Sequence, residues 1–275
     1  MAEQLEEMFF FKGGCVDLLG FLHSPAHSTR TTAIVHCHPF AEEKNCSHAV
    51  TVKAARAFAR QGFVVFRFDY SGCGDSGGEF SDFSLQDWIE DTNAAIAELK
   101  RRTRSQNVIL WGTRLGAALA LACARDRDDV AGLILWQPSF HFKDYIHQFI
   151  RQKLVSDFSN KRQAVSLQAL LHKVASGGAV QVYGYPISTL LYASFLAMDD
   201  AYPHPETPHP SYIATISNMP SAPLQLVRDS EWLMQNPASS CVHIVEEPFW
   251  DRYWRWDAVR TIEKTQAWLT KIQGG

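Results

Sequence analysis

The stretch that decides the fold runs from Leu110 to Gly116 and reads Leu-Trp-Gly-Thr-Arg-Leu-Gly. The apolar run at 108–111 predicts a buried strand, and the small-residue run at 115–124 predicts a helix. Gly112 and Gly116 permit a sharp turn and a close contact between the two elements. We therefore predict a strand–turn–helix unit of an α/β protein.

The same alternation of strand and helix signals extends on both sides of this unit. Strands are predicted at 16–22, 33–37, 63–68 and 133–136, and further helices at 49–60 and 85–99. Ser84 is the expected N-cap of the helix at 85–99, because Asp87 follows three residues later. Repeated strand–helix units predict a mostly parallel, doubly wound sheet with helices on both faces.

The alternation stops at residue 138. Helical signals dominate residues 139–220, strand signals resume at 224–227 and 242–245, and a last helix is predicted at about 256–272. We therefore predict a core formed by residues 1–138 and 221–275, into which residues 139–220 are inserted as a helical cap. Such insertions lie at the carboxyl ends of the strands, where ligands bind.

Composition excludes several classes of protein. The 275 residues carry a net charge of −3, whereas nucleic-acid binders usually show a basic excess. The six cysteines form no C-x-x-C pair, which favours free thiols in a reducing compartment. The acidic start has no secretory signal, and no uninterrupted apolar stretch is long enough to span a membrane. We expect a soluble, cytoplasmic protein that binds no nucleic acid.

The unit around Gly112 and Gly116 has the context of the nucleophile elbow of α/β-hydrolases, G-x-S-x-G. The central position is occupied by Arg114. A guanidinium stays protonated and offers only hydrogen-bond donors, so it cannot attack a carbonyl as a serine does. The alternative interpretation is a strand–helix turn of an α/β protein that is not a hydrolase.

Several segments resemble one family of this fold, the exosortase-system-associated hydrolases of the second type. The resemblance spans about residues 18–269 and rests on HPFAEE at 38–43, FDYSGCGDSGG at 68–78, Trp88 with Asp91, LWGTRLG at 110–116, GYPIS at 184–188 and EPFW at 247–250. It implies an α/β-hydrolase fold and a place in bacterial gene clusters for exopolysaccharide and PEP-CTERM protein sorting. It implies no particular substrate.

The other two positions of a hydrolase triad are poorly filled. In α/β-hydrolases the acid follows a late strand and the histidine follows the last one. Asp229, after the predicted strand at 224–227, is a candidate acid or a solvated residue that caps a helix. No histidine follows 242–245, where Trp250 lies near the vacant base position, and His243 is expected to be an ordinary strand residue.

Two substitutes for the missing groups are open. His36, His38, Cys46 and His48 are four nitrogen or sulfur ligands that together suit a tetrahedral zinc site. Alternatively, a Cys73 thiolate acts as nucleophile with His38 as base. The commoner roles of these residues are an oxyanion loop for the HPFAEE segment and a buried apolar position for the cysteine. We expect no metal and no cofactor.

Arg114 needs a negative partner, because a helix N-terminus repels a cation and burial of an unpaired guanidinium is costly. Glu42, Glu43, Asp229 or a bound anion is the expected partner, either as a structural ion pair or as a ligand. The candidate ligand-binding residues are His38, Pro39, Phe40, Glu42, Glu43, Thr113, Arg114 and Leu115.

The sequence therefore favours a non-catalytic ligand-binding or accessory protein. The expected partners are an anionic or acyl small molecule and the exopolysaccharide or protein-sorting machinery. The alternative is an ester or acyl hydrolase, or an acyl transferase, that uses a displaced catalytic group. Trp136, Trp250, Trp254 and Trp256 are candidates for stacking on sugars, although burial in the core is the commoner role of tryptophan.

Overall fold

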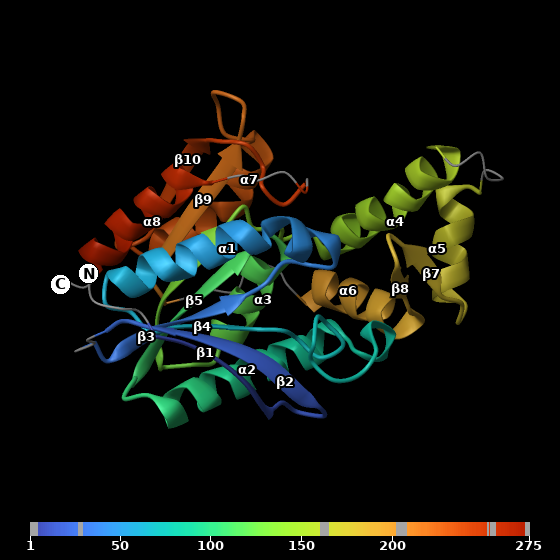
Figure 1. Cartoon of the computed structure of the whole chain (residues 1–275). Coiled ribbons are helices and arrows are strands. Elements are labelled where there is room, and N and C mark those ends of the chain that lie inside the picture. Colours follow the sequence, from blue (N-terminus) through green and yellow to red (C-terminus); the bar gives the residue numbers. More distant parts are fainter. Residues whose placement is uncertain are drawn as a thin grey trace.

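A central sheet organises the chain (Figure 1). The computed structural model describes residues 5–26, 30–159, 165–201, 208–251, 253 and 257–272. Within them the sheet has the order β1–β2–β4–β3–β5–β6–β9–β10. The strands are β1 (Leu5–Lys12), β2 (Asp17–Ser24), β3 (Thr32–Cys37), β4 (Val65–Phe68), β5 (Asn107–Thr113), β6 (Val130–Trp136), β9 (Ser211–Ser217) and β10 (Ser240–Val245). Only the β1–β2 and β2–β4 pairs are antiparallel among these described strands, so the sheet is mostly parallel, as predicted.

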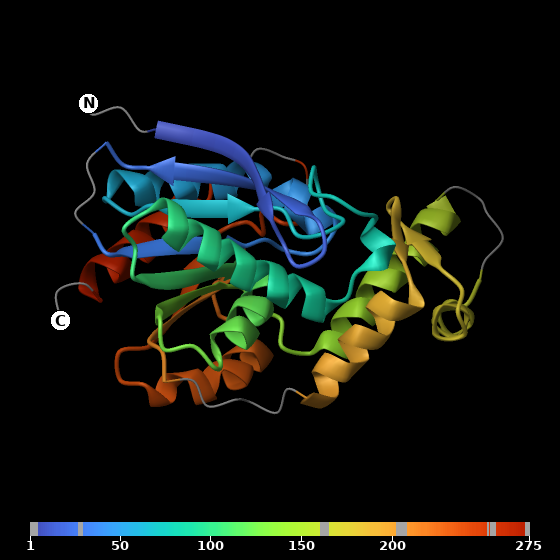
Figure 2. The same ribbon diagram turned by 90° about the horizontal axis from the view of Figure 1, so that it is seen from below.

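Helices cover both faces of the sheet (Figures 1 and 2). Helices α1 (Glu42–Arg60) and α8 (Val259–Lys271) lie on one face, and α2 (Leu85–Arg102) and α3 (Leu115–Ala124) on the other. Strand β5 contributes side chains to the cores on both faces of the sheet. Ile109 and Trp111 belong to the core beneath α1 and α8. Val108 and Leu110 belong to the core on the opposite face. A strand buried on both sides reads as a continuous apolar run, which is why it was predictable.

The predicted N-cap of α2 is confirmed. The Ser84 hydroxyl accepts a hydrogen bond from the Asp87 backbone N–H at 3.3 Å, and the Asp87 carboxylate accepts one from the Ser84 N–H at 2.7 Å. Two backbone donors that the helix cannot satisfy itself are thereby paired, which defines where the helix begins.

A largely helical part projects from one end of the sheet (Figure 1). It contains α4 (Phe142–Ser159), α5 (Leu167–Ala175), a short hairpin of β7 (Val180–Val182) and β8 (Tyr185–Ile187), and α6 (Thr189–Ala201). The predicted cap boundary at residue 220 is wrong, because β9 pairs with β6 and β10 in the central sheet. Its sequence SYIATIS mixes buried hydroxyl groups with apolar residues, which weakened the strand signal. Residues 160–164 and 202–207 of the predicted cap lie outside the described residues.

The predicted strand at 224–227 is also wrong, because these residues begin helix α7 (Leu224–Ser230). A run of four residues is compatible with either period, so its pattern alone does not decide between helix and strand. Asp229 consequently lies on a helix and not in the loop directly after a strand. Short 3₁₀ helices lie at η1 (Phe80–Asp82) and η2 (Glu231–Gln235), and residue 256, the predicted start of α8, lies outside the described residues.

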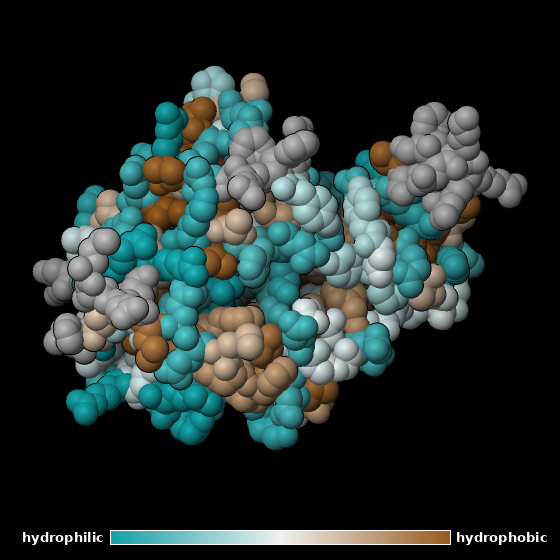
Figure 3. Space-filling model, viewed as in Figure 1, coloured by the Kyte–Doolittle hydropathy of each residue, from teal (hydrophilic) through white to brown (hydrophobic). Residues whose placement is uncertain are grey.

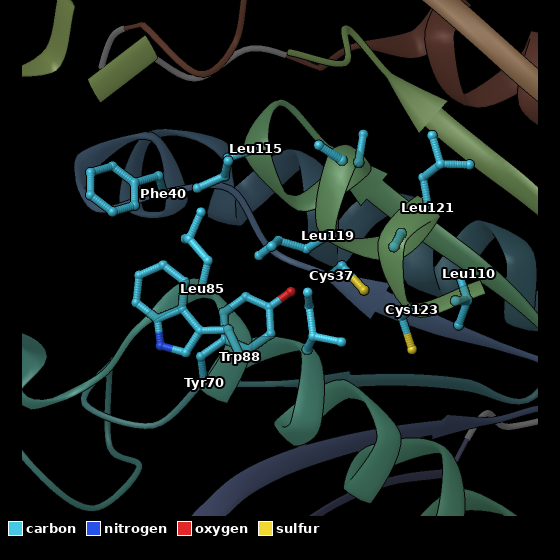
Figure 4. Close-up of a cluster of buried hydrophobic side chains, with 14 of the residues drawn as sticks. Cys37, Phe40, Tyr70, Leu85, Trp88, Leu110, Leu115, Leu119, Leu121 and Cys123 are labelled. Atoms are coloured by element: carbon cyan, nitrogen blue, oxygen red, sulfur yellow. The ribbon is translucent and has the colours of Figure 1, made fainter. Parts of the chain in front are cut away.

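Apolar packing supports the turn between β5 and α3 from below (Figure 4). Leu115 and Leu119 of α3 point toward Leu85 and Trp88 of α2. Trp88 stacks on Tyr70 with ring centres 5.5 Å apart, and its indole N–H donates to the Ser71 carbonyl at 3.1 Å. The turn therefore rests on a filled and hydrogen-bonded core.

Within the described residues, no helix combines the length and apolar character needed to cross a bilayer. The six cysteines are all free thiols.

Candidate functional site

The turn at residues 112–116, hereafter the elbow, is held in a strained shape. Arg114 has φ 56° and ψ −121°, a conformation that non-glycine residues rarely adopt. A Cβ on Gly112 would lie 2.3 Å from the Gly116 carbonyl oxygen, and one on Gly116 would lie 2.2 Å from the Cys37 carbonyl oxygen. Both positions therefore require glycine, and the backbone has the shape that presents a nucleophile in α/β-hydrolases.

The Arg114 side chain is held by a carboxylate and two aromatic rings. Its Nε donates to Oε1 of Glu43 at 3.2 Å, and the hydroxyl of Tyr145 donates to Oε2 of the same carboxylate at 2.5 Å. The guanidinium carbon lies 5.5 Å from the ring centre of Tyr145 and 5.4 Å from that of Trp250. Both distances suit cation–π attraction. Glu43 is therefore the expected acidic partner, whereas Glu42 accepts hydrogen bonds from other side chains.

The charges of this group follow from burial and pairing. Burial acts to lower the pKa of Arg114, but Glu43 and its other acidic neighbours outweigh that effect and raise it. Burial raises the pKa of Glu43, although Arg114 and Tyr145 oppose this by stabilising the carboxylate. Because both Glu43 oxygens accept a hydrogen bond, we treat the pair as ionised at neutral pH. Burial also raises the pKa of Tyr145 well above its usual value, so its hydroxyl stays a donor.

A cavity of about 740 Å³ opens above the elbow, within the size range of small-molecule sites. Hereafter the first cavity, it is bordered by the start of α1, by α4, by the β7–β8 turn and by the loop after β10. Figure 3 shows the surface indented where the helical part projects from the core. The described lining residues are Glu42, Glu43, Cys46, Arg114, Tyr145, Gln148, Phe149, Gln152, Tyr183, Trp250, Asp251 and Tyr253. This described lining includes no serine, threonine or histidine.

The remaining triad positions do not hold the usual acid and histidine among the described residues. Trp250 is 5% exposed and turns its ring toward Arg114, in the region where the sequence predicted a vacant base position. His243 is a strand residue, whose ring nitrogens lie 3.0 Å from the Thr215 hydroxyl and 2.9 Å from the Met219 carbonyl. The loop directly after β9, residues 218–223, contains no carboxylate.

The carboxylate of Asp229 is engaged by two side chains, those of His141 and Gln225. Its Oδ2 lies 2.9 Å from Nε2 of His141, and its Oδ1 accepts a hydrogen bond from Gln225 at 2.8 Å. Asp229 is not among the residues described as lining the first cavity. Neither Asp229 nor His141 is therefore part of the described lining of the first cavity.

The two substitutes considered from the sequence are not supported. Burial raises the pKa of the Cys73 thiol to about 12, so it is not an available thiolate. Cys46 lines the first cavity, but burial and the neighbouring Glu42 raise its pKa to about 11. Neither thiol has the depressed pKa of a catalytic cysteine.

The four zinc ligands considered from the sequence are not brought together in the described part of the chain, which contains no group of three or more potential ligands arranged to hold a metal. His38 uses both ring nitrogens in hydrogen bonds, since Nδ1 lies 2.7 Å from the Pro39 carbonyl and Nε2 accepts the Tyr70 N–H at 3.2 Å. A neutral ring with Nδ1–H satisfies both contacts and leaves no lone pair for a metal.

Only some of the predicted binding residues share one cavity. Glu42, Glu43, Arg114 and Trp250 line the first cavity. Phe40, Thr113 and Leu115 are buried in the core, as is Trp136. His38 and Pro39 line a second, smaller cavity. Trp254 and Trp256 lie outside the described residues.

The sequence reasoning missed one complete wall of the first cavity. Tyr145, Gln148, Phe149 and Gln152 of α4 face it together. Their spacing of i, i+3, i+4 and i+7 marks one face of a helix, so the signal was present in the sequence. Tyr183, Asp251 and Tyr253 come from turns and loops, where no periodic signal exists.

Comparison with known proteins agrees with this geometry. The family profile described as serine aminopeptidase, S33, matches residues 29–185. An uncharacterized 31.7 kDa protein of the traX-finO intergenic region of Escherichia coli is 29% identical over 153 residues, which are 55% of this chain and 49% of that protein. The quorum-quenching protein AidA of Acinetobacter baumannii is 28% identical over 127 residues, 45% of this chain and 41% of AidA. The matched region thus spans about half the length of these curated relatives or less.

Solved structures of similar shape cover nearly the whole chain. A hydrolase of unproven activity from Agrobacterium vitis has a TM-score of 0.65 at 19% identity and covers 97% of this chain and 99% of its own. Est1E from Butyrivibrio proteoclasticus, with bound ferulic acid, has a TM-score of 0.67 at 14% identity over 97% of this chain and all of its own. The predicted α/β-hydrolase fold is confirmed, and the chain belongs to the serine aminopeptidase S33 family of that fold.

Proposed function

We propose that the protein is a non-hydrolytic member of its family, in which the cavity above the elbow binds a small molecule. The observation that carries the proposal is Arg114, paired with Glu43 at the position where a hydrolase places its nucleophile. An arginine offers donors and positive charge but no nucleophilic atom. The elbow then serves to orient a ligand rather than to attack one.

The lining of the first cavity favours an uncharged, hydroxyl-rich ligand such as a saccharide. Within the described lining, the carboxylates of Glu42 and Glu43 face the guanidinium of Arg114, which Glu43 already pairs, so an anion would meet net negative charge. Carboxylates accept hydrogen bonds from hydroxyl groups, and glutamine amides both donate and accept them. The aromatic rings of the lining offer apolar faces for a sugar ring. This charge balance makes the anionic ligand expected from the sequence the less favourable choice.

The sequence resemblance to exosortase-system-associated hydrolases supports a setting for such a ligand. In that setting the protein is an accessory component of exopolysaccharide or PEP-CTERM protein-sorting machinery and works in the cytoplasm. A saccharide ligand in the first cavity fits the polysaccharide half of that machinery.

The second candidate is an ester or acyl hydrolase, or an acyl transferase, that uses a displaced group. Esterases among the structural neighbours favour it. Against it stands the described lining of the first cavity, in which Cys46 is the one thiol or hydroxyl besides tyrosines and has a raised pKa.

Binding measurements separate the two candidates. Cellotriose, maltotriose and chitotriose are titrated into the protein by calorimetry, beside trigalacturonate and octanoate as acidic and acyl probes. We expect saturable binding of a neutral trisaccharide, weakened about tenfold or more in Tyr183→Ala because an exposed ring that lines the cavity is lost. Phe10→Ala is the matched control, because Phe10 is exposed on β1 outside the cavity lining.

Two results would contradict the proposal. One is binding of only the acidic or acyl probes. The other is steady turnover of p-nitrophenyl acyl esters that co-purifies with the protein, which would support the second candidate.

A further inference from the structure

The second cavity lies under α1, at the edge formed by β2, β4 and β3, and has a volume of about 170 Å³. His36 and Arg67 are direct partners in the β3–β4 register, and both line this cavity. Lys44 reaches it from α1, and Asp69 from the end of β4. The described linings of the two cavities share no residue, because different faces of the first turns of α1 border them.

Arg67 is a half-buried cation that, among the described residues, touches no carboxylate directly, although Asp69 and Glu6 stabilise its charge at longer range. Its Nε donates to Nε2 of His23 at 3.0 Å, and Nδ1 of that ring lies 3.0 Å from Oε1 of Glu6. Burial lowers the pKa of His23 to about 4, so the ring is neutral and donates its Nδ1–H to Glu6 while Nε2 accepts from Arg67. The neutral ring of His23 therefore separates the Arg67 guanidinium from the Glu6 carboxylate.

The outer edge of this guanidinium is open. Among the described residues, no carboxylate lies within ion-pair distance of Arg67, and its two terminal amino groups have no hydrogen-bond partner. Burial lowers the pKa of Arg67 to about 10, which still leaves it a cation at neutral pH. The guanidinium carbon lies 5.0 Å from the ring centre of Phe21, within the range of cation–π attraction. A rigid two-donor edge suits bidentate contact with an oxyanion.

A buried ring nitrogen in the lining of the second cavity is also unpaired. His36 is 2% exposed, and its Nε2 has no hydrogen-bond partner among the described residues. Lys44 lies 2.8 Å from Asp69, so the acidic group nearest the cavity is neutralised by its own partner. The remaining carboxylate of the lining, Asp75, is exposed to solvent, which weakens its repulsion of an anion without removing it.

We propose that the second cavity binds a small tetrahedral oxyanion, either inorganic phosphate or the phosphate group of a small monoester. Arg67 supplies the bidentate edge, and His36 and Lys44 supply further contacts. The volume admits a phosphate group but not a sugar chain, so this site differs in ligand class from the first cavity. The proposal does not depend on what the first cavity binds.

Phosphate titration by calorimetry tests the proposal, with ionic strength held constant by sodium chloride. Inorganic phosphate and glycerol 3-phosphate form separate arms that distinguish the two sources of the anion. We expect saturable binding in at least one arm, weakened about tenfold or more in Arg67→Met because the two-donor edge is removed. Arg101→Met is the matched control, because Arg101 is exposed and pairs with Glu98 outside the cavity.

A second variant keeps the test decisive if Arg67→Met does not fold. Asp75→Asn changes one exposed side chain at the cavity and is expected to tighten phosphate binding about threefold, because a like charge is removed. Absence of saturable binding in both arms would overturn the proposal, as would an affinity unchanged in Asp75→Asn. Loss of phosphate binding in Arg114→Gln but not in Arg67→Met would place the anion in the first cavity and would also overturn it.

Discussion

The elbow and the loops after β9 and β10 are the two regions that together form the triad of an α/β-hydrolase, and they differ sharply in this protein. The elbow is fixed by contacts that leave no space, since a Cβ on Gly112 or Gly116 would approach a carbonyl oxygen within 2.3 Å. In the loop after β9, by contrast, residues 218–220 are exposed. The backbone of the elbow has kept its hydrolase shape, whereas the loop after β9 carries no carboxylate and the described part of the loop after β10 carries no histidine.

The difference shows which part of an active site the fold itself maintains. Packing of β5, α3 and the end of β3 requires the strained turn whatever side chain stands at its centre. Nothing in that packing requires a serine at position 114 or a histidine near position 250. Membership of a hydrolase family therefore does not by itself establish hydrolysis, which depends on which side chains occupy a few positions.

The largest expected loss of stability comes from a substitution within the elbow itself. Gly116→Ala places a Cβ 2.2 Å from the Cys37 carbonyl oxygen, so β3 and α3 must move apart. We expect a loss of at least about 3 kcal/mol in the free energy of unfolding, measured by urea denaturation. Gly14→Ala is the control, because its Cβ would meet only a side-chain oxygen at 3.7 Å. A cost below about 1 kcal/mol at Gly116 would show that the elbow is not held by packing.

The next effect concerns the charge placed on the elbow. Arg114→Met leaves Glu43 buried without its cation, and we expect a loss of about 2–3 kcal/mol in stability at pH 7. In the double variant with Glu43→Gln the loss should be smaller than the sum of the two single losses, by about 1–2 kcal/mol. Strictly additive losses in this cycle would mean that the ion pair does not stabilise the elbow.

The third effect appears as a pH dependence of the loop that faces the elbow. Burial lowers the pKa of His38 to about 3 in the folded protein, against an ordinary value near 6.5. The unfolded chain therefore binds a proton that the folded protein does not, and stability that is complete above about pH 6.5 is lost as the pH falls toward 3. His38 should contribute a loss of about 2 kcal/mol between pH 7 and pH 5.

Urea denaturation of His38→Asn at both pH values checks this contribution. The variant should lose less stability on acidification than the wild type, whereas His172→Asn, on the exposed side of α5, should follow the wild type. Equal losses in wild type and His38→Asn would show that His38 titrates alike in the folded and unfolded chains.

The smallest effect is expected in the exposed loop after β9. Asn218→Asp introduces a carboxylate directly after β9, near where a hydrolase carries its acid. Because Asn218 is exposed, we expect a change within about 0.5 kcal/mol in stability by urea denaturation. A loss comparable to that of Gly116→Ala would contradict the contrast between the two regions.

Strong local patterns made much of the fold predictable. The buried strand at β5, the glycines of the elbow and the capping box at Ser84 each depend on residues close together in the sequence. Strand β9 was missed because its buried serine and threonine hide the apolar run, and α7 because four residues do not define a period. Because the start of α7 was assigned as a strand, Asp229 was predicted to follow a strand at the acid position of the triad, whereas it lies within the helix.

The need of the candidate site for an acidic partner of Arg114 was predictable from the sequence, but the residues that line the first cavity were not. The need of Arg114 for a carboxylate followed from general cost arguments, and Glu43 meets it. The face of α4 that bears Tyr145 and Phe149 was readable from its spacing, although its position over the elbow depends on how the projecting helices pack. The unpaired edge of Arg67 arises from contacts between β1, β2 and β4, which no local pattern reveals.

The central claim is that the elbow has kept the shape of a hydrolase without its chemistry, and intact-mass spectrometry after incubation with a fluorophosphonate probe tests it most directly. The wild-type protein should keep its mass. Arg114→Ser should also remain essentially unlabelled, because no histidine in the described cavity lining can activate the new serine. Stoichiometric labelling of one residue in the wild type, together with ester turnover well above buffer, would contradict the account.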